Sequence, residues 1–334
     1  MPPMTPTSWP GPATRPSAPS ATQGGIGLAE TMVALAVGAL LGLLALAMLG
    51  MANTGYVLQT QAAQLDDNGR YALDMVGRAL RQTGWQNWDG TTGPIELDAA
   101  APAALDGLDA HSLGRAGEGI EVAAADVANG SDVLAVRFDG AGAAPDGDGS
   151  VVNCAGFGVP AEQGPPSRGW SIFYVGRGAD GETELRCKYR GHAGWAADAL
   201  VRGVDSFQVL YGLDSTDGAP GPSHGFVTAS TLRALDAALV LAAPDAAGQA
   251  RERQRRTYWK RVRSVRIALL LHSERGGGGE GEPALFDLFG KAYSDAFAGS
   301  DPGTRIDEAR LPPDLRARAR RVVSASFTLR NRAL

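Results

Sequence analysis

An apolar segment near the amino terminus places the strongest constraint on how this chain folds. It runs from Gly25 to Met51, with the sequence GIGLAETMVALAVGALLGLLALAMLGM, and contains one ionisable side chain, Glu30. A helix of about 20 apolar residues is long enough to cross a bilayer. A carboxylate near the bilayer centre costs on the order of 2.5 to 3.5 kcal/mol, so it normally marks a function or a partner. The segment therefore predicts a transmembrane helix in which Glu30 is a functional residue.

Two simpler interpretations of this segment fit less well. A secretory signal peptide has an apolar core of about 7 to 15 residues and a small-residue cleavage site, whereas this apolar run is longer. A plain single-span anchor fits the length but gives no reason for Glu30 or for the paired glycines Gly24 and Gly25. Arg15 precedes the segment and Arg70 is the first basic residue after it. By the positive-inside rule, this distribution favours a cytoplasmic amino terminus.

The helical pattern continues beyond the apolar segment into an amphipathic stretch. Apolar residues recur there at the spacing of one helix face: Leu58, Ala62, Leu65, Ala72, Val76 and Leu80. The opposite face is polar, with Gln59, Gln64, Asp67, Arg70, Asp74, Arg78 and Arg81. One helix from Ile26 to Gln82 would be roughly 85 Å long at about 1.5 Å per residue, with Gly84 as its stop and Gly69 as a weak point. A separate surface helix after the anchor is the alternative.

After Trp85 the chain becomes rich in Gly, Ala, Asp and Pro, and short extended runs replace the helical period. Such runs, separated by Gly and Pro clusters, predict strands. We expect them at Asp132–Phe138, Trp170–Val175, Thr183–Tyr189, Val201–Tyr211, Tyr258–Leu271 and Val322–Leu329. Long irregular loops are predicted at 140–149, 214–225 and 276–283. The sequence thus predicts a long helix followed by a β-rich head.

The start of the apolar segment resembles the class III signal of type IV prepilins. The resemblance rests on Gly25, a hydrophobic residue at Ile26, Leu28, Glu30 and the run MVALAVGALLGLL. It implies that prepilin peptidase cleaves after Gly25 and methylates the new amino terminus on Ile26. Glu30 would then pair with such an amine on a neighbouring subunit during assembly. Three details depart from the family pattern: a Gln-Gly pair stands where basic residues commonly precede the glycine, Ile26 replaces the usual Phe, and Ala29 replaces a larger aliphatic residue.

Further runs resemble the PilW-type minor pilins, in the same order along the chain. These runs are NGRYALDMVGRALRQTGW in the stem, then SDVLAVRFDG, the LRC that ends at Cys187, VRGVDSFQVLYGLD, WKRVRSVRIALLLHSE and VSASFTLRNR. The resemblance implies an α+β fold, a type IV pilin-like lollipop in which a long N-terminal helix packs on an antiparallel β-sheet head. The expected parts are a removed leader (1–25), the transmembrane half of the stem helix (26–52), its amphipathic half (53–84) and a periplasmic head (85–334).

The same resemblance implies a non-enzymatic function in pilus assembly. The expected protein is a minor pilin that helps to initiate the type IV pilus within a tip-located complex. Its expected partners are prepilin peptidase, other minor pilins, the major pilin and the inner membrane. It would span the inner membrane once, with a cytoplasmic amino terminus and a periplasmic head, and would reach the pilus tip after assembly. The alternatives are a minor pseudopilin of a type II secretion system and, from another class, a tip adhesin or DNA-uptake receptor.

The chain has two cysteines, Cys154 and Cys187. They are too few for a zinc site without histidine ligands, and no histidine lies at ligand spacing from either. An oxidising periplasm favours a disulfide between them. The closed loop would contribute about 4 kcal/mol to stability in the loop-entropy model. Two separate buried thiols are the alternative.

The sequence contains no recognisable catalytic or metal-binding motif, and no cofactor is expected. The histidines lie outside zinc-protease and nucleophile-elbow patterns, and each is expected to be structural: His111, His192, His224 and His272. The stretch Gly114–Gly119 does not match the dinucleotide fingerprint. The pairs Asp146/Asp148 and Asp214/Asp217 miss the spacing of a calcium loop and are expected to lie in solvated turns.

One basic run, RERQRRTYWKRVRSVR at 251–266, stands out in a chain whose net charge is −5. The overall acidity argues against a general nucleic-acid-binding protein, so any basic site must be local. With Tyr258 and Trp259 interleaved, the run is a candidate patch for DNA or another anionic ligand, made of Arg251, Arg253, Arg255, Arg256, Lys260, Arg261 and Arg263. The favoured alternative is a loop over Arg251–Arg256 followed by a strand whose charges cover its solvated face.

Overall fold

The computed structural model describes residues 27–86, 99–121, 123–124, 126–161, 169–214, 225–276, 282–316 and 318–331. The chain divides into two compact units, Met1–Tyr56 and Val57–Leu334. The predicted leader, the cleavage position Gly25 and the methylation position Ile26 lie outside the described residues. Cleavage and methylation therefore stay predictions, as do the domain boundaries drawn from the sequence.

The described part of the first unit is the apolar half of helix α1 (Leu28–Gln82). Its large aliphatic side chains are exposed, and no residue of its most apolar window is buried. Within the described ranges, α1 is the one helix that is long and apolar enough to cross a membrane, judged by length and composition. Each large aliphatic side chain left in water forgoes about 1.5 to 3 kcal/mol of burial free energy. An apolar surface of this extent therefore calls for an apolar environment.

Helix α1 is 55 residues long and unbroken, which confirms the prediction of one continuous helix. Its carboxyl-terminal part belongs to the second unit and buries one face: Gln61, Leu65, Gly69, Ala72, Val76, Gly77, Ala79 and Leu80. The residues predicted for the polar face, from Gln59 to Arg81, are all exposed. Two residues of the predicted apolar face, Leu58 and Ala62, are also exposed. Burial against the head therefore becomes continuous only from Leu65 onward.

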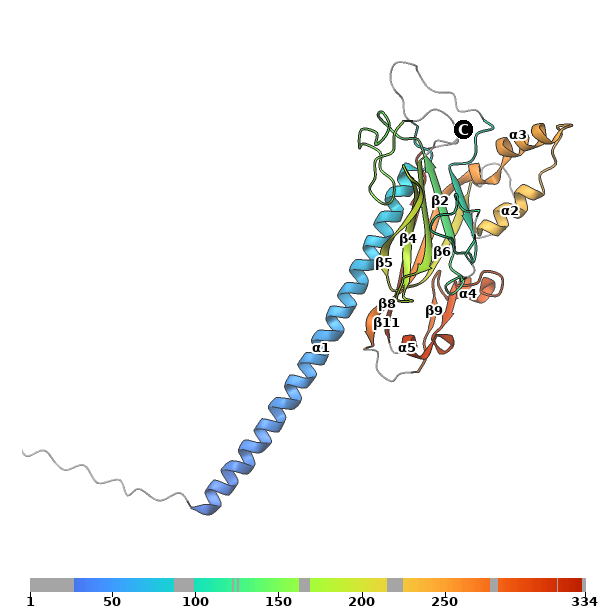
Figure 1. The fold of residues 1–334 in the computed structure, drawn as a ribbon. Coiled ribbons are helices and arrows are strands. Elements are labelled where there is room, and N and C mark those ends of the chain that lie inside the picture. The colour runs from blue at the N-terminus through green and yellow to red at the C-terminus, as the bar shows by residue number, and fades with distance from the viewer. Residues whose placement is uncertain are drawn as a thin grey trace, which may run out of the picture. The chain divides into compact units, whose positions relative to one another are not determined.

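Antiparallel sheets form the core of the head (Figure 1). Five strands pair in sequence order as β1 (Leu105–Leu108), β2 (Val133–Phe138), β3 (Gly169–Arg177), β4 (Thr183–Gly191) and β5 (Gly194–Arg202). Four strands pair in the order β11 (Arg318–Thr328), β8 (Val262–Gly276), β6 (Val204–Leu213) and β7 (Phe226–Val227). In the described part of the chain, β9 (Leu285–Asp287) and β10 (Arg305–Asp307) form a separate two-stranded sheet.

Short helices lie at the two ends of the head (Figure 1). Helices α2 (Ala229–Ala237) and α3 (Ala246–Arg256) lie at one end, and α4 (Lys291–Phe297) and α5 (Pro313–Arg316) lie at the other. Two 3₁₀-helices, η3 (Tyr258–Arg261) and η4 (Glu308–Arg310), precede β8 and α5. Long helix and antiparallel sheets together confirm the predicted α+β, pilin-like fold class.

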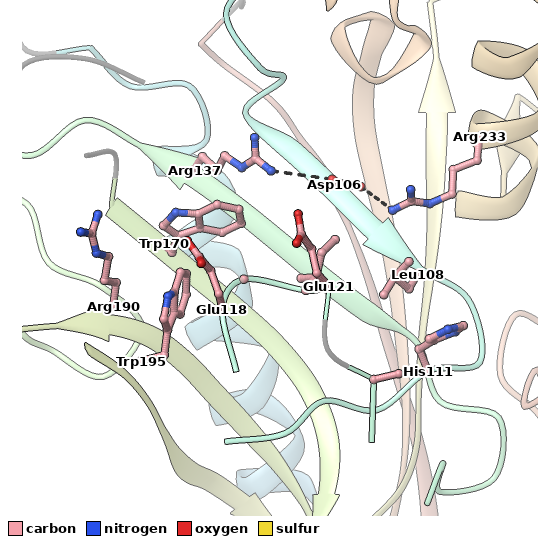
Figure 2. A pocket seen from close by; sticks show the side chains of 13 residues that line it. Asp106, Leu108, His111, Glu118, Glu121, Arg137, Trp170, Arg190, Trp195 and Arg233 are labelled. Carbon is pink, nitrogen blue, oxygen red and sulfur yellow. Dashed lines mark hydrogen bonds and ion pairs between the residues drawn. The ribbon is translucent and has the colours of Figure 1, made fainter. Parts of the chain in front are cut away.

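The main core lies between the two larger sheets and the buried face of α1. Alternate residues of each strand point into it, because successive side chains of a strand face opposite sides. Phe173 of β3, Phe207 of β6 and Val76 of α1 are among its fully buried members. A second cluster covers the outer face of the five-stranded sheet beneath residues 111–121 (Figure 2). A third lies on the outer face of the four-stranded sheet, around Leu288 and Ile306.

The prediction of one strand over Val201–Tyr211 was wrong, because Gly203 divides it. Strand β5 ends at Arg202 and pairs with β4, whereas β6 begins at Val204 and pairs with β8 in the other sheet. Gly203 has φ of +72°, a conformation that glycine adopts without the steric cost of a Cβ. A Cβ there would also lie 2.6 Å from the carbonyl oxygen of His272. Gly203 is therefore the point where the chain crosses between sheets.

Two predictions around the basic run were also wrong. Arg251–Arg256 is the second half of helix α3 rather than a loop. Asp245 caps that helix by accepting a hydrogen bond from Gly248 N at 2.6 Å, as N-cap residues do. The strand predicted from Tyr258 begins at Val262, because Tyr258–Arg261 forms η3. Asp236 holds this turn by accepting from Tyr258 N at 2.7 Å.

Candidate assembly helix and ligand surfaces of the head

Glu30 lies in the first turn of α1 and is exposed. Its Oε2 accepts a hydrogen bond from Gly27 N at 3.2 Å, and a carboxylate at this end of a helix interacts favourably with the helix dipole. No other charged residue follows along α1 until Asp66. The carboxylate is therefore isolated on an apolar surface. Its predicted partner, the amine of Ile26, lies outside the described residues.

Two glycines let the head half of α1 approach strand β11 closely. A Cβ on Gly69 would lie 2.8 Å from Val323 Cγ1, and a Cβ on Gly77 would lie 2.5 Å from Phe327 Cε1. Both distances are far below the usual van der Waals contact of carbon atoms, about 3.5 to 4.0 Å. Gly69, expected to be a weak point of the helix, is therefore a packing position. The sequence contains part of this signal, since Gly69 falls on the predicted apolar face, whereas Gly77 lies at its edge.

Side-chain contacts fasten the two ends of this helix–strand interface. Asp66 of α1 forms an ion pair with Arg321 of β11 at 3.0 Å. At the other end, Asn331 Nδ2 donates to the carbonyl oxygens of Arg81 at 3.3 Å and Thr83 at 3.1 Å. These carbonyls belong to the last turn of α1, where no helical donor remains for them. The helix ends just before Gly84, as the sequence predicts.

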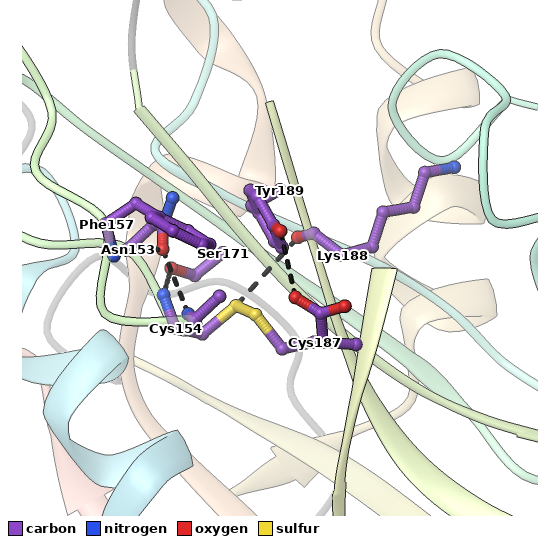
Figure 3. Close-up of a disulfide and its surroundings, with 9 residues drawn as sticks. Asn153, Cys154, Phe157, Ser171, Cys187, Lys188 and Tyr189 are labelled. Atoms are coloured by element: carbon purple, nitrogen blue, oxygen red, sulfur yellow. Dashed lines mark hydrogen bonds between the residues drawn. A yellow bond between two sulfur atoms is a disulfide. The ribbon is translucent and has the colours of Figure 1, made fainter. Parts of the chain in front are cut away.

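The predicted disulfide is present, between Cys187 of β4 and Cys154 of the segment that precedes β3 (Figure 3). The two Cα atoms are 5.8 Å apart, and both residues are buried in the main core. Cys154 N donates to Ser171 Oγ of β3 at 3.0 Å. The bridge therefore ties an irregular segment to the inner face of the five-stranded sheet. It has a structural role in the head.

A buried ionic network joins β11 to three other parts of the head. Arg320 of β11 donates to Asp205 Oδ2 of β6 at 2.9 Å and to Glu308 Oε1 of η4 at 2.7 Å. The Arg320 and Asp205 side chains are 0% exposed. Both ring nitrogens of His272 in β8 have carboxylate partners: Asp205 Oδ1 at 2.9 Å and Glu182 Oε1. His272 is therefore structural, as predicted.

The residues of the basic run lie on three successive elements. Arg251, Arg253, Arg255 and Arg256 lie on α3, Lys260 and Arg261 on η3, and Arg263 on β8. Several already have partners within the head. Arg256 pairs with Glu252 at 2.9 Å and Arg263 with Asp214 at 3.3 Å, while Lys260 Nζ donates to Ala99 O at 2.6 Å.

The aromatic residues of the basic run are also engaged. Trp259 is buried and packs edge-on against Tyr211, with ring centroids 4.9 Å apart. Arg261 lies over the ring of Tyr258 at 4.9 Å. Bases of a single strand bind by stacking on exposed aromatic rings. Trp259 is therefore a core residue, and this arrangement weakens the interpretation of the run as a DNA-binding surface.

The remaining histidines and aspartates singled out in the sequence are dispersed. His111 Nδ1 lies 2.8 Å from the carbonyl oxygen of Asp109, and His192 Nε2 lies 2.7 Å from Asp146 Oδ1. Asp148 accepts from the hydroxyl and amide of Ser150. His224 and Asp217 lie outside the described residues. Over the described ranges, no group of three or more His, Cys, Asp or Glu side chains is arranged to hold a metal ion.

Two buried carboxyl groups have raised pKa values. Asp132, beside β2, accepts from Val209 N of β6 at 2.8 Å, and its burial raises its pKa well above the usual range. Asp301, which follows α4, accepts from the Tyr293 hydroxyl at 2.9 Å. Burial raises the pKa of Asp301 to about 6. Sequence reasoning missed both residues, because their burial depends on long-range packing.

Comparison with known proteins gives one family. The model of the family described as type IV pilus-assembly protein W matches residues 172–331, from β3 to the segment that follows β11. No curated protein and no solved structure shows significant similarity to the chain. The matched region contains the four-stranded sheet and most of the strands that enclose the main core. The match confirms the resemblance seen in the sequence: residues 172–331 of this chain match the PilW family of type IV pilus assembly.

Proposed function

We propose that this chain is a minor pilin that primes type IV pilus assembly as part of a tip-located minor pilin complex. One observation carries the proposal: α1 exposes a continuous apolar surface from Leu28 to Met51, on which Glu30 is the single charge. The pilus-assembly family and this apolar helix together indicate a membrane-anchored protein. Before assembly, the amino terminus would be cytoplasmic and the head periplasmic.

The proposed mechanism follows from the cost of the Glu30 carboxylate in lipid. An unpaired carboxylate near the bilayer centre costs on the order of 2.5 to 3.5 kcal/mol. Pairing with the amino terminus of a neighbouring subunit, formed by cleavage after Gly25 and methylated at Ile26, would remove this cost. A first complex of minor pilins held by such pairs would lower the barrier to extracting the following subunits. The role is structural, and no reaction is assigned to the head.

The alternatives from the sequence are weaker on present observations. The matched family is one of type IV pilus assembly, which favours a pilus over a type II secretion system. A DNA-uptake receptor that uses Arg251–Arg266 is disfavoured, because Trp259 is buried and several of the basic side chains are already paired.

Substitution of Glu30 tests the proposal directly. In cells that carry Glu30→Ala, we expect fewer pili by electron microscopy, with the same amount of the chain in the membrane fraction. Thr31→Ala is the matched control, because the neighbouring residue also loses a polar group, and it should leave the pilus number unchanged. Unchanged piliation in Glu30→Ala would refute the docking role.

Processing is tested separately by intact-mass analysis of the membrane-extracted chain. In cells with prepilin peptidase, the mature chain should begin at N-methyl-Ile26. In cells without the peptidase, the leader should remain. A chain left uncut in both strains would make it an anchored protein outside the pilin class.

A further inference from the structure

The outer face of the five-stranded sheet carries a row of alternating arginine and tryptophan side chains. Arg137 of β2 is paired in register with Trp170 of β3, and Arg190 of β4 with Trp195 of β5. Arg137 lies 4.2 Å above the Trp170 ring, and the two indoles meet edge-on with centroids 5.5 Å apart. Figure 2 shows the Trp170 ring between Arg137 and Trp195. The row therefore presents two adjacent indoles flanked by fixed hydrogen-bond donors.

This row forms one wall of a cavity of about 460 Å³. The segment at 118–121 also lines the cavity, and Glu118 lies beside the two indoles (Figure 2). A neighbouring cavity of about 720 Å³ is lined by Phe157, Tyr189 and the same Trp195. The two cavities also share Arg190. The second cavity continues around the end of the β4–β5 hairpin, because Tyr189 faces the main core. The first cavity, on the outer face of the sheet, is called the groove below.

The charges of the groove are balanced rather than of one sign. Asp106 pairs with Arg233 at 2.9 Å and with Arg137 at 3.8 Å. Glu118, Glu121 and Arg190 also line the cavity. A site for phosphate or for a polyanion has a surplus of cations, which this groove lacks. Its chemistry suits an uncharged ligand that has many hydroxyl groups and flat apolar faces.

A buried lysine lies beside the Trp195 ring. Lys188 of β4 is fully buried, and its Nζ has no hydrogen-bond partner among the described residues. Nζ lies 5.7 Å from the centroid of the Trp195 ring, within the range of a cation–π interaction. Burial lowers the pKa of Lys188, and burying an amine without a hydrogen-bond partner costs stability.

We propose that this groove binds a neutral oligosaccharide, with a sugar ring packed against Trp195 and sugar hydroxyls on the flanking arginine and glutamate side chains. Pyranose rings present apolar C–H faces that pack on indoles, and their hydroxyls both donate and accept hydrogen bonds. The Trp170 ring is covered by Arg137 at 4.2 Å, which leaves Trp195 as the aromatic anchor. The site lies in the head and does not involve Glu30, so it goes beyond the priming function and is independent of it.

The test is binding of the detergent-extracted full chain to an array that carries bacterial cell-wall glycans and animal-cell glycans. Binding to either set supports the proposal, and the set that is bound identifies the source of the ligand. For the glycan that binds most tightly, Trp195→Ala should raise the Kd by about tenfold or more, the usual cost of removing a central aromatic anchor. Trp195→Tyr keeps a ring at this position and should retain most of the affinity. Tyr258→Ala removes an aromatic ring outside the groove and should retain all of it.

Absence of glycan binding by the unaltered chain would overturn the proposal, as would binding that Trp195→Ala leaves unchanged. A third result would also overturn it: no glycan binds, but Trp195→Ala abolishes the binding of another pilin subunit. The groove would then be a subunit interface. Because cells with Trp195→Ala should assemble a normal number of pili, a failure here is distinguishable from a failure of the Glu30 experiment.

Discussion

Replacing Arg320 with Met should lower the free energy of unfolding of the head by about 3 to 5 kcal/mol, the usual cost of breaking a buried ion pair on one side. The guanidinium is 0% exposed and binds Asp205 Oδ2 at 2.9 Å and Glu308 Oε1 at 2.7 Å. It also donates to Leu315 O at 2.6 Å. Methionine occupies similar space but has no donor. The Asp205 carboxylate would therefore stay buried after losing its arginine partner.

The adjacent residue provides the control. Arg321→Met removes the same group from the same strand, but Arg321 is 59% exposed and its partner Asp66 is 39% exposed, at 3.0 Å. An exposed pair of this kind contributes about 0 to 1 kcal/mol. The two variants differ mainly in the burial of the lost charge. The additional loss of unfolding free energy in Arg320→Met, compared with Arg321→Met, therefore measures how much the buried network contributes to stability.

Urea unfolding of the detergent-extracted chain, followed by near-ultraviolet circular dichroism, gives both values. The Arg320→Met loss corresponds to a fall in Tm of about 6 to 20 °C for a domain of this size. Asp205→Asn combined with Arg320→Met should cost less than the sum of the two single changes, because both variants break the same contact. Equal losses in Arg320→Met and Arg321→Met would refute the reasoning.

Two further predictions concern packing and pH. Gly77→Leu should destabilise the head by about 1 to 3 kcal/mol, because the new side chain overlaps Phe327 and overpacking has this cost. Gly55→Leu is the control and should leave the stability of the head unchanged, since no atom lies within 4 Å of the Cβ position of Gly55. Equal effects of the two substitutions in urea unfolding would contradict the close helix–strand contact. Asp301 has a folded-state pKa of about 6, above the value of about 3.9 expected in the unfolded chain, so its contribution to stability should decline as pH rises from 4 to 6. Asp301→Asn should make the decline in stability shallower, with a part remaining because the pKa of Asp132 is also raised, and identical pH profiles of the two proteins would show that Asp301 does not contribute to the decline.

The stem helix could be predicted from the sequence because its determinants are local. Apolar length sets the first half of α1, and a helical period sets the second half. The residues Leu65, Ala72, Val76 and Leu80 fall on one face by spacing alone, and all four are buried. The close approach of α1 to strand β11 could not be predicted from this spacing. It depends on Val323 and Phe327, which lie far along the chain.

The errors arose where tertiary contacts override a local pattern. Val201–Tyr211 has a continuous strand pattern, but Gly203 ends one sheet and begins another. Arg251–Arg256 reads as a solvated charge run, yet arginine is a good helix former and Asp245 supplies the cap. The Asp245 signal was present in the sequence. The division at Gly203 depends on the packing of its neighbours against β8, which no local pattern specifies.

The groove on the head could be predicted from the sequence only in part. Arg137 stands between Val136 and Phe138, which point into the main core, and Trp170 stands two residues before Ile172, which faces the other side, so alternation places both on the outer face. The same holds for Arg190, which follows the inward-facing Tyr189. The sequence could therefore assign these residues to one face of their strands. Their order in a single row depends on the register Arg137–Trp170 and Arg190–Trp195, and a shift of two residues would keep every face but separate the indoles. Register, which is set by the whole sheet, is thus what turns separate outward side chains into a binding surface.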